Sequence, residues 1–232
     1  MRRKELGYLL LWLLAGSLAV ALACPLDSRV DAAFDVTNDP VSHRIAMWFT
    51  KLGEGWAPAL LGIFFIVLYV RRHRPDVAAK IFFVVVAGEL IGVAGVIVRL
   101  FVGRTRPSAH VPQGFYGIWH DGHWIIGQFD YSAFPSGHTC IAVGMATAAW
   151  LVHRGWGTAA ALFALAVAWS RVAFGSHHLS DVIASVVLAV PLAVMLKKTL
   201  LPFLETQFAR WDSSRQKEKV FIPPDPQKGN AR

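Results

Sequence analysis

Long apolar stretches constrain the fold of this chain more than any other feature of its sequence. Six such runs cover most of the first 201 residues, with charged or polar segments between them. A helix needs roughly 20 apolar residues to cross a membrane, and lipid leaves no backbone polar group unpaired, so these runs predict spanning helices. They lie at Leu6–Ala23, Trp56–Val70, Ala78–Val102, Thr139–Val152, Gly157–Phe174 and Val182–Leu201. We expect an all-α bundle of about six transmembrane helices, of which the second and fourth are short.

The composition agrees with a single membrane domain. Charged residues make up 16% of the 232 residues, whereas soluble domains carry about 25%. We expect a transmembrane domain over residues 1–205 and a basic cytoplasmic tail over residues 206–232, whose Pro-rich end is typical of disorder. The net charge of +8 is divided among short clusters between the apolar runs. This pattern favours membrane topology over a nucleic-acid-binding surface.

The distribution of Lys and Arg predicts the orientation. With the N-terminus inside, the inner segments hold most of the basic residues, as the positive-inside rule requires. These inner residues are Arg2, Arg3, Lys4, Arg71, Arg72, Arg74, Lys80, Arg154, Lys197 and Lys198, together with those of the tail. The long aromatic loop from about Gly103 to Phe134 then lies outside. We expect a bacterial inner (plasma) membrane protein with this loop on the periplasmic or outer face.

Two segments near the N-terminus have alternative interpretations. The first apolar run ends in Ala21-Leu22-Ala23 before Cys24, which also fits a signal-peptide cleavage site. Cleavage there would leave the later orientation unchanged. Between the first two runs, four apolar residues follow helical spacing, namely Ile45, Trp48, Phe49 and Leu52. They predict an amphipathic helix that lies on the outer membrane surface or packs against the bundle.

Arginines gather at the outer end of the third apolar run. Arg99 and Arg106 are seven residues apart, which places them on nearly one face if the helix continues. Pro107 disfavours helix at Arg106, so that residue projects from the helix end in the alternative arrangement. Guanidinium groups stay charged and bind phosphate oxygens through paired N–H donors. These arginines therefore predict a phosphate site.

A second segment of this kind, Pro135-Ser136-Gly137-His138, stands directly before the fourth apolar run. Ser136 is a suitable helix cap, and the free amides of a first helical turn favour an anion. Gly137 would let the backbone approach that anion closely. On its own, this segment would indicate only a capped turn.

A third segment joins the fifth and sixth runs. Arg171 closes the fifth run, and His177 and Asp181 are four residues apart, so on a helix they share one face. A carboxylate bound to one imidazole nitrogen fixes the tautomer and frees the other nitrogen for attack. His178 is the competing candidate, although its spacing to Asp181 is less favourable. Together, the three segments predict catalysis on a phosphorylated lipid.

In order and spacing, these segments resemble the type 2 phosphatidic acid phosphatase (PAP2) superfamily, which includes the vanadium haloperoxidases. The family pattern is Lys-x6-Arg-Pro, then Pro-Ser-Gly-His, then Ser-Arg-x5-His-x3-Asp. This chain carries Arg99 where the family usually has Lys, which keeps the charge but changes its shape. The remaining motif positions are intact, namely Arg106, Pro107, Pro135, Ser136, Gly137, His138, Ser170, Arg171, His177 and Asp181.

The resemblance implies a role for each matched residue. His177 would be the nucleophile, Asp181 would orient it, and His138 would protonate the leaving oxygen and then activate water. The phosphate oxygens would be held by Arg99, Arg106, Ser136, Gly137 and Arg171. Phosphoryl transfer mostly requires such positioning and charge stabilisation, and this chemistry implies no metal and no cofactor.

The expected partner is a phosphorylated lipid within the bilayer and no nucleic acid, and the sequence carries no information on protein partners. Candidate substrates are undecaprenyl pyrophosphate, phosphatidylglycerol phosphate, phosphatidic acid and a lipid A-type phosphate. A lipid phosphotransferase would carry the same motifs, because its phosphohistidine would pass phosphate to another lipid instead of water. A non-catalytic transporter or scaffold is a further alternative, but it predicts a missing His or Asp, and both are present.

Overall fold

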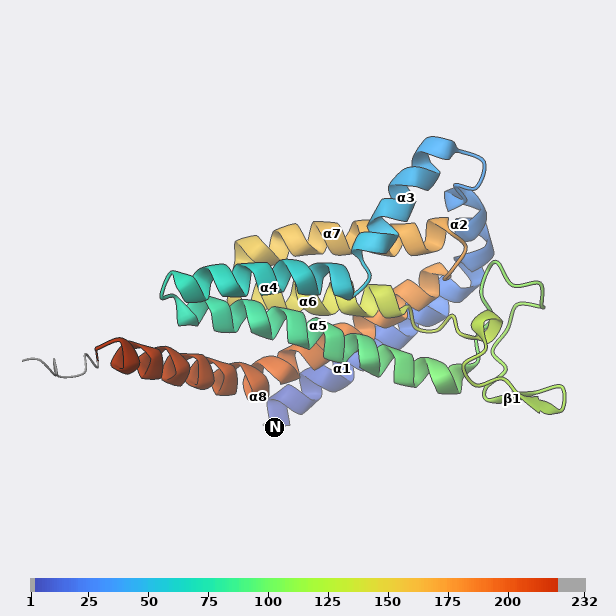
Figure 1. Cartoon of the computed structure of the whole chain (residues 1–232). Helices are drawn as coiled ribbons and strands as arrows, with labels where there is room; N and C mark the ends of the chain where they lie inside the picture. The colour runs from blue at the N-terminus through green and yellow to red at the C-terminus, as the bar shows by residue number, and fades with distance from the viewer. Residues whose placement is uncertain (1–2, 221–232) are drawn as a thin grey trace, which may run out of the picture.

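In the computed structural model, which describes residues 3–220, every apolar run of the sequence forms a helix. Most of the helices lie side by side along one direction (Figure 1). They are α1 (Arg3–Ala23), α2 (Asp27–Phe34), α3 (Pro40–Leu52), α4 (Trp56–Arg71), α5 (Pro75–Val102), α6 (Gly137–Val152), α7 (Arg154–Ala173) and α8 (Leu179–Val220). Short 3₁₀ turns occupy Cys24–Leu26 and Phe129–Tyr131, and the strands β1 (Trp119–His120) and β2 (His123–Trp124) form an antiparallel hairpin. The predicted all-α membrane bundle is confirmed.

The number of spans is less definite than the number of apolar runs. Within the described residues, four helical stretches are long and apolar enough to cross a membrane, and the pair α3 and α4, bent by 56°, makes a fifth if counted as one span. The remaining apolar helix, α6, has only 16 residues. The expected count of about six is therefore approximate, because α4 and α6 form where predicted but are short.

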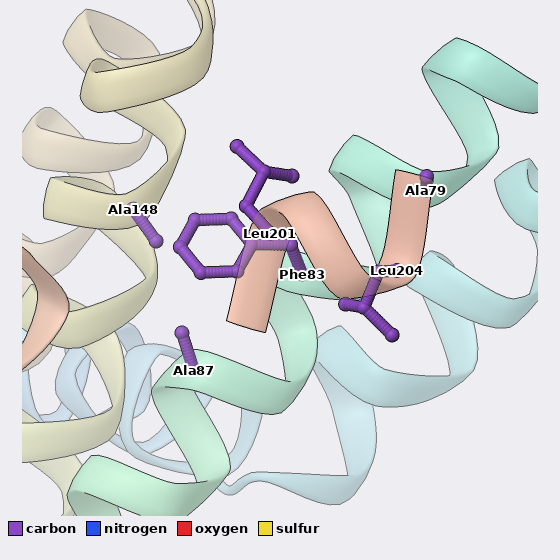
Figure 2. Packing of buried hydrophobic residues seen from close by; sticks show 6 residues of the cluster. All are labelled: Ala79, Phe83, Ala87, Ala148, Leu201 and Leu204. Atoms are coloured by element: carbon purple, nitrogen blue, oxygen red, sulfur yellow. The ribbon is translucent and has the colours of Figure 1, made fainter. Parts of the chain in front are cut away.

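Helix α6 lies at the centre of the bundle and packs against α5, α7 and α8. On one side of it, the ring of Phe83 from α5 is fully buried beside Ala148 of α6 and Leu201 of α8 (Figure 2). Further along this contact α5 presents Gly92, where a Cβ atom would overlap the side chain of Ile141. Small residues at such contacts let helices approach closely in lipid, where water provides no driving force between them.

The ends of two helices determine where the site forms. Helix α5 stops because Gly103 adopts a left-handed conformation with φ of 60°, a common C-terminal cap. A Cβ atom at Gly103 would overlap the backbone of Gly117, so the position requires glycine. At the other end of the chain, α8 continues past the last apolar run. The expected tail is helical as far as Val220, and residues 221–232 lie outside the described part.

Candidate active site

The three motif arginines come from three different positions at one end of the bundle. Arg99 lies in the last turn of α5 and Arg171 in the last turn of α7. Because α5 ends at Val102, Arg106 projects from the loop that follows. The alternative in which Arg106 leaves the helix end is therefore the observed one.

Arg106 is held rigidly by the protein backbone. Its Nε donates to the carbonyl of Phe129 at 2.8 Å, and its η nitrogens donate to the carbonyls of Ser132 and Ser176 at 3.2 and 3.3 Å. The guanidinium also lies over the Phe129 ring, 3.9 Å from the centroid. Burial lowers the pKa of Arg106 to about 10, and the nearby charge of Arg99 acts in the same direction.

Of these three arginines, Arg106 and Arg171 are buried and Arg99 is half-buried. Within residues 3–220, none of Arg99, Arg106 and Arg171 forms an ion pair, and the Nε atoms of Arg99 and Arg171 have no hydrogen-bond partner. In the described part of the chain, the one hydrogen bond of the Arg171 side chain goes from Nη1 to the hydroxyl of Thr50, at 3.4 Å. Buried charges are normally paired, so a cluster of arginines without direct ion pairs is suited to bind an anion.

Ser136 caps α6, as the sequence predicted. Its hydroxyl accepts hydrogen bonds from the amide and the hydroxyl of Thr139, at 3.4 and 2.9 Å. The Ser136 amide donates to Ser185 of α8 at 3.0 Å, so it is not available to a ligand. Within the described chain, the amides of Gly137 and His138 have no hydrogen-bond partner, and they remain as the anion-binding donors of this helix end.

Gly137 also makes room for an arginine. A Cβ atom there would overlap Nη2 of Arg99, so the guanidinium lies directly against the helix start. The next residue, His138, lies within electrostatic range of Arg99, Arg171 and His177. The structure thus brings the second motif together with the arginines of the other two.

His177 is buried, with 1% of its surface exposed, in the segment between α7 and α8. Its Nδ1 lies 2.6 Å from the carbonyl oxygen of Ala133, to which it donates, whereas the nearest Asp181 oxygen is 3.8 Å away. The backbone carbonyl therefore fixes the tautomer and leaves Nε2 with a free lone pair. Burial lowers the pKa of His177 well below its usual value, and the charges of Arg171 and Arg106 lower it further.

Asp181 has partners that the sequence analysis did not identify. Its two oxygens accept from Nη1 of Arg104 at 2.5 Å and from the amide of His178 at 2.8 Å. Arg104 is itself buried, with 6% exposure, and also donates to the Ser180 hydroxyl at 2.6 Å. The proximity of Arg104 to the first motif was the only sequence signal for it, and a backbone acceptor such as Ala133 gives none.

One carboxylate lies near the arginines without pairing with them, and no group of side chains suggests a metal site in the described residues. Glu54, between α3 and α4, lies within electrostatic range of Arg171 and His138 and accepts from the Trp56 indole at 2.6 Å. Among residues 3–220 no three His, Cys, Asp or Glu side chains are grouped as a metal site would require.

Comparison with known structures supports the fold. Two crystal structures share the fold at 18% sequence identity. One is LpxE from Aquifex aeolicus, with a TM-score of 0.51 over 75% of this chain and 95% of that one. The other is described as the first transmembrane PAP2 type phosphatidylglycerolphosphate phosphatase from Bacillus subtilis, with a TM-score of 0.58 over 82% of this chain and 93% of that one.

Sequence comparison identifies a family but no individual relative. A search of curated proteins gives no significant match. The family model of the PAP2 superfamily matches residues 77–202, which is more than half of the chain and contains all three motifs. This integral membrane protein therefore belongs to the PAP2 superfamily.

Proposed function

We propose that the protein is a phosphatase that removes a phosphate group from a membrane lipid through a phosphohistidine. The observation that carries this proposal is the set of three arginines around a histidine whose Nε2 is free. Arg106 and Arg171 are buried, Arg99 is half-buried, and none of the three forms an ion pair within residues 3–220. Such a site binds an anion and presents a neutral nucleophile to it. The printed description of the Bacillus subtilis structure names a phosphatidylglycerolphosphate phosphatase, which supports the same reaction class.

The reaction proceeds in two steps, formation and hydrolysis of the phosphohistidine. Nε2 of His177 attacks phosphorus, the bond to the lipid oxygen breaks, and that oxygen takes a proton from His138. His138 then removes a proton from water, whose oxygen attacks phosphorus and displaces His177. Arg99, Arg106 and Arg171 hold the phosphoryl oxygens in both steps, and the carbonyl of Ala133 keeps the His177 proton on Nδ1.

An apolar cavity gives the lipid chains a place beside this site. It has a volume of about 630 Å³ and lies between α4, α5, α6 and α7. Its lining begins at Leu52 and Gly53, next to Glu54, and extends to Ile81 and Trp156 toward the other end of the bundle. With the headgroup in the arginine cluster, the acyl or prenyl chain could therefore lie in this apolar cavity, along the helices.

We propose that the site faces the outside of a bacterial inner membrane. The surplus of Lys and Arg at the opposite ends of the helices supports this orientation. The substrate would be one of the four candidates, namely undecaprenyl pyrophosphate, phosphatidylglycerol phosphate, phosphatidic acid or a lipid A-type phosphate. Three arginines fit either a monophosphate or a diphosphate, so an experiment is needed to identify the substrate.

The test is phosphate release by the purified protein in detergent with a chelator present. The four lipids are supplied in parallel, and His177→Ala is compared with His123→Ala, which changes an exposed histidine on the hairpin. Release that is lost in His177→Ala and retained in His123→Ala supports the proposal. Equal release from both variants, or release that requires added metal, contradicts the mechanism. Transfer of labelled phosphate to an acceptor lipid without free phosphate identifies the phosphotransferase instead.

A further inference from the structure

Two carboxylates of helix α2 contact the segment that carries the nucleophile. Asp27 and Asp31 are four residues apart, on one face of this short helix. Both lie well before residue 77, where the match to the PAP2 superfamily begins. Their contacts are made with residues that the mechanism does not use.

Asp27 accepts hydrogen bonds from Ser180, which precedes Asp181, and from Arg104, which also donates to Asp181. Its Oδ1 accepts from the Ser180 amide at 3.0 Å, and its Oδ2 accepts from the Ser180 hydroxyl at 2.6 Å. The same Oδ2 accepts from Nη2 of Arg104 at 2.6 Å, while Nη1 of Arg104 donates to Asp181. Asp27, Arg104 and Asp181 are at least nine-tenths buried, so solvent does not screen this chain of charges.

Asp31 holds the residue that follows the nucleophile. Its Oδ2 lies 2.6 Å from Nδ1 of His178, and Nε2 of His178 donates to the carbonyl of Thr105 at 3.2 Å. The backbone amide of His178 donates to Asp181 at 2.8 Å. Both neighbours of the His177–Asp181 pair are therefore fixed by one face of α2.

We propose that α2 positions the nucleophile, with Asp27 and Asp31 as positioning residues that hold the segment from His177 to Asp181 in its reactive geometry. The proposal rests on the function proposed above. The Asp181 carboxylate is 3.8 Å from His177 because Arg104 and the His178 amide hold it there. Arg104 donates to both Asp27 and Asp181. Without Asp27, Arg104 would be paired with Asp181 alone, and the Asp181 carboxylate would be displaced.

The first test is the steady-state kinetics of Asp27→Asn. The amide keeps an oxygen for the Ser180 amide, but its NH₂ group faces Nη2 of Arg104, which is also a donor. A displaced nucleophile lowers kcat by roughly 10- to 100-fold, while KM stays within about threefold because the phosphate-binding arginines are untouched. The matched control is Asp35→Asn at the end of α2, whose carboxylate accepts from the amide and the hydroxyl of Thr37 and contacts neither Arg104 nor Ser180 in the described part of the chain. It should keep wild-type kinetics.

Two further measurements separate positioning from a purely structural role. If Asp27 acts through Arg104, Asp27→Asn adds nothing to the kcat loss of Arg104→Gln, so the double variant matches the single one. Additive losses, or a lower melting temperature with unchanged kcat, overturn the proposal.

Hydrogen exchange tests the same geometry without relying on activity. In Asp27→Ala the amides of the segment from Gly175 to Val182 should exchange faster than in the wild type, whereas in Asp35→Ala they should not. Equal exchange rates overturn the proposal even if the phosphatase activity is confirmed. Faster exchange in a protein that hydrolyses none of the four lipids would support the positioning role of α2 and refute only the proposed function.

Discussion

Replacement of Gly137 by alanine tests how closely Arg99 approaches the start of α6. The new Cβ atom would overlap Nη2 of Arg99, so the guanidinium has to move away from the site. Alanine is otherwise well suited to a first helical turn, and Gly137 does not need a positive φ. The substitution should therefore reduce activity without lowering the melting temperature.

The size of the loss follows from the hydrogen bonds that Arg99 would make to a phosphate. A hydrogen bond to a charged group contributes about 1.5–3 kcal/mol, so loss of one such bond lowers kcat/KM roughly 10- to 150-fold. Lysine lacks the η nitrogens, and the PAP2 pattern has lysine at this position. Adding Arg99→Lys to Gly137→Ala should therefore restore most of the lost activity. Two damaging substitutions normally lower the activity further when they are combined.

The assay is steady-state phosphate release by the two single variants and the double variant, with melting temperatures measured in parallel. Gly7→Ala is the matched control, because a Cβ atom there would meet no atom of another helix within 4 Å. Full activity of Gly137→Ala would refute the steric argument. A double variant no better than Gly137→Ala would show that glycine is needed for the phosphate itself rather than for Arg99.

Three other measurements follow from the structure. Because folding lowers the pKa of His177, the unfolded chain takes up a proton at this residue as the pH falls below about 6.5, while the folded protein does not. The free energy of unfolding therefore decreases below that pH. The melting temperature should drop more in the wild type than in His177→Gln between about pH 7.5 and pH 5. Ala160→Phe, which fills the apolar cavity, should raise KM for a long-chain lipid phosphate and leave KM for a short-chain analogue unchanged. If the aromatic loop selects the substrate, replacing Trp119 and Trp124 by alanine should change the ranking of the four lipids, and an unchanged ranking would refute that role.

Hydropathy predicted where helices form better than where they end. The third run was expected from Ala78, but α5 begins earlier, at Pro75, because proline is favourable in a first turn. The sixth run was expected to end at Leu201, where apolar residues stop. The helix continues to Val220 because the residues beyond are good helix formers, although they are too polar for lipid.

Motif spacing identified the side chains of the site but not the groups that hold them. The ring of His177 was expected to donate to Asp181, and it donates to a backbone carbonyl instead. No sequence pattern reveals a backbone acceptor 44 residues away. Arg104 and Asp27 were missed for a related reason, since their contact joins segments 77 residues apart that meet only after the bundle has assembled.

The three carbonyls that hold Arg106 come from two segments of the chain, one before α6 and one before α8. This guanidinium is therefore placed before any ligand arrives, and its ordering cost is met during folding rather than in each catalytic cycle. A pocket rigid enough to fit the phosphoryl group of a lipid also fits free phosphate. Inorganic phosphate should then compete with the lipid substrate for the same arginines.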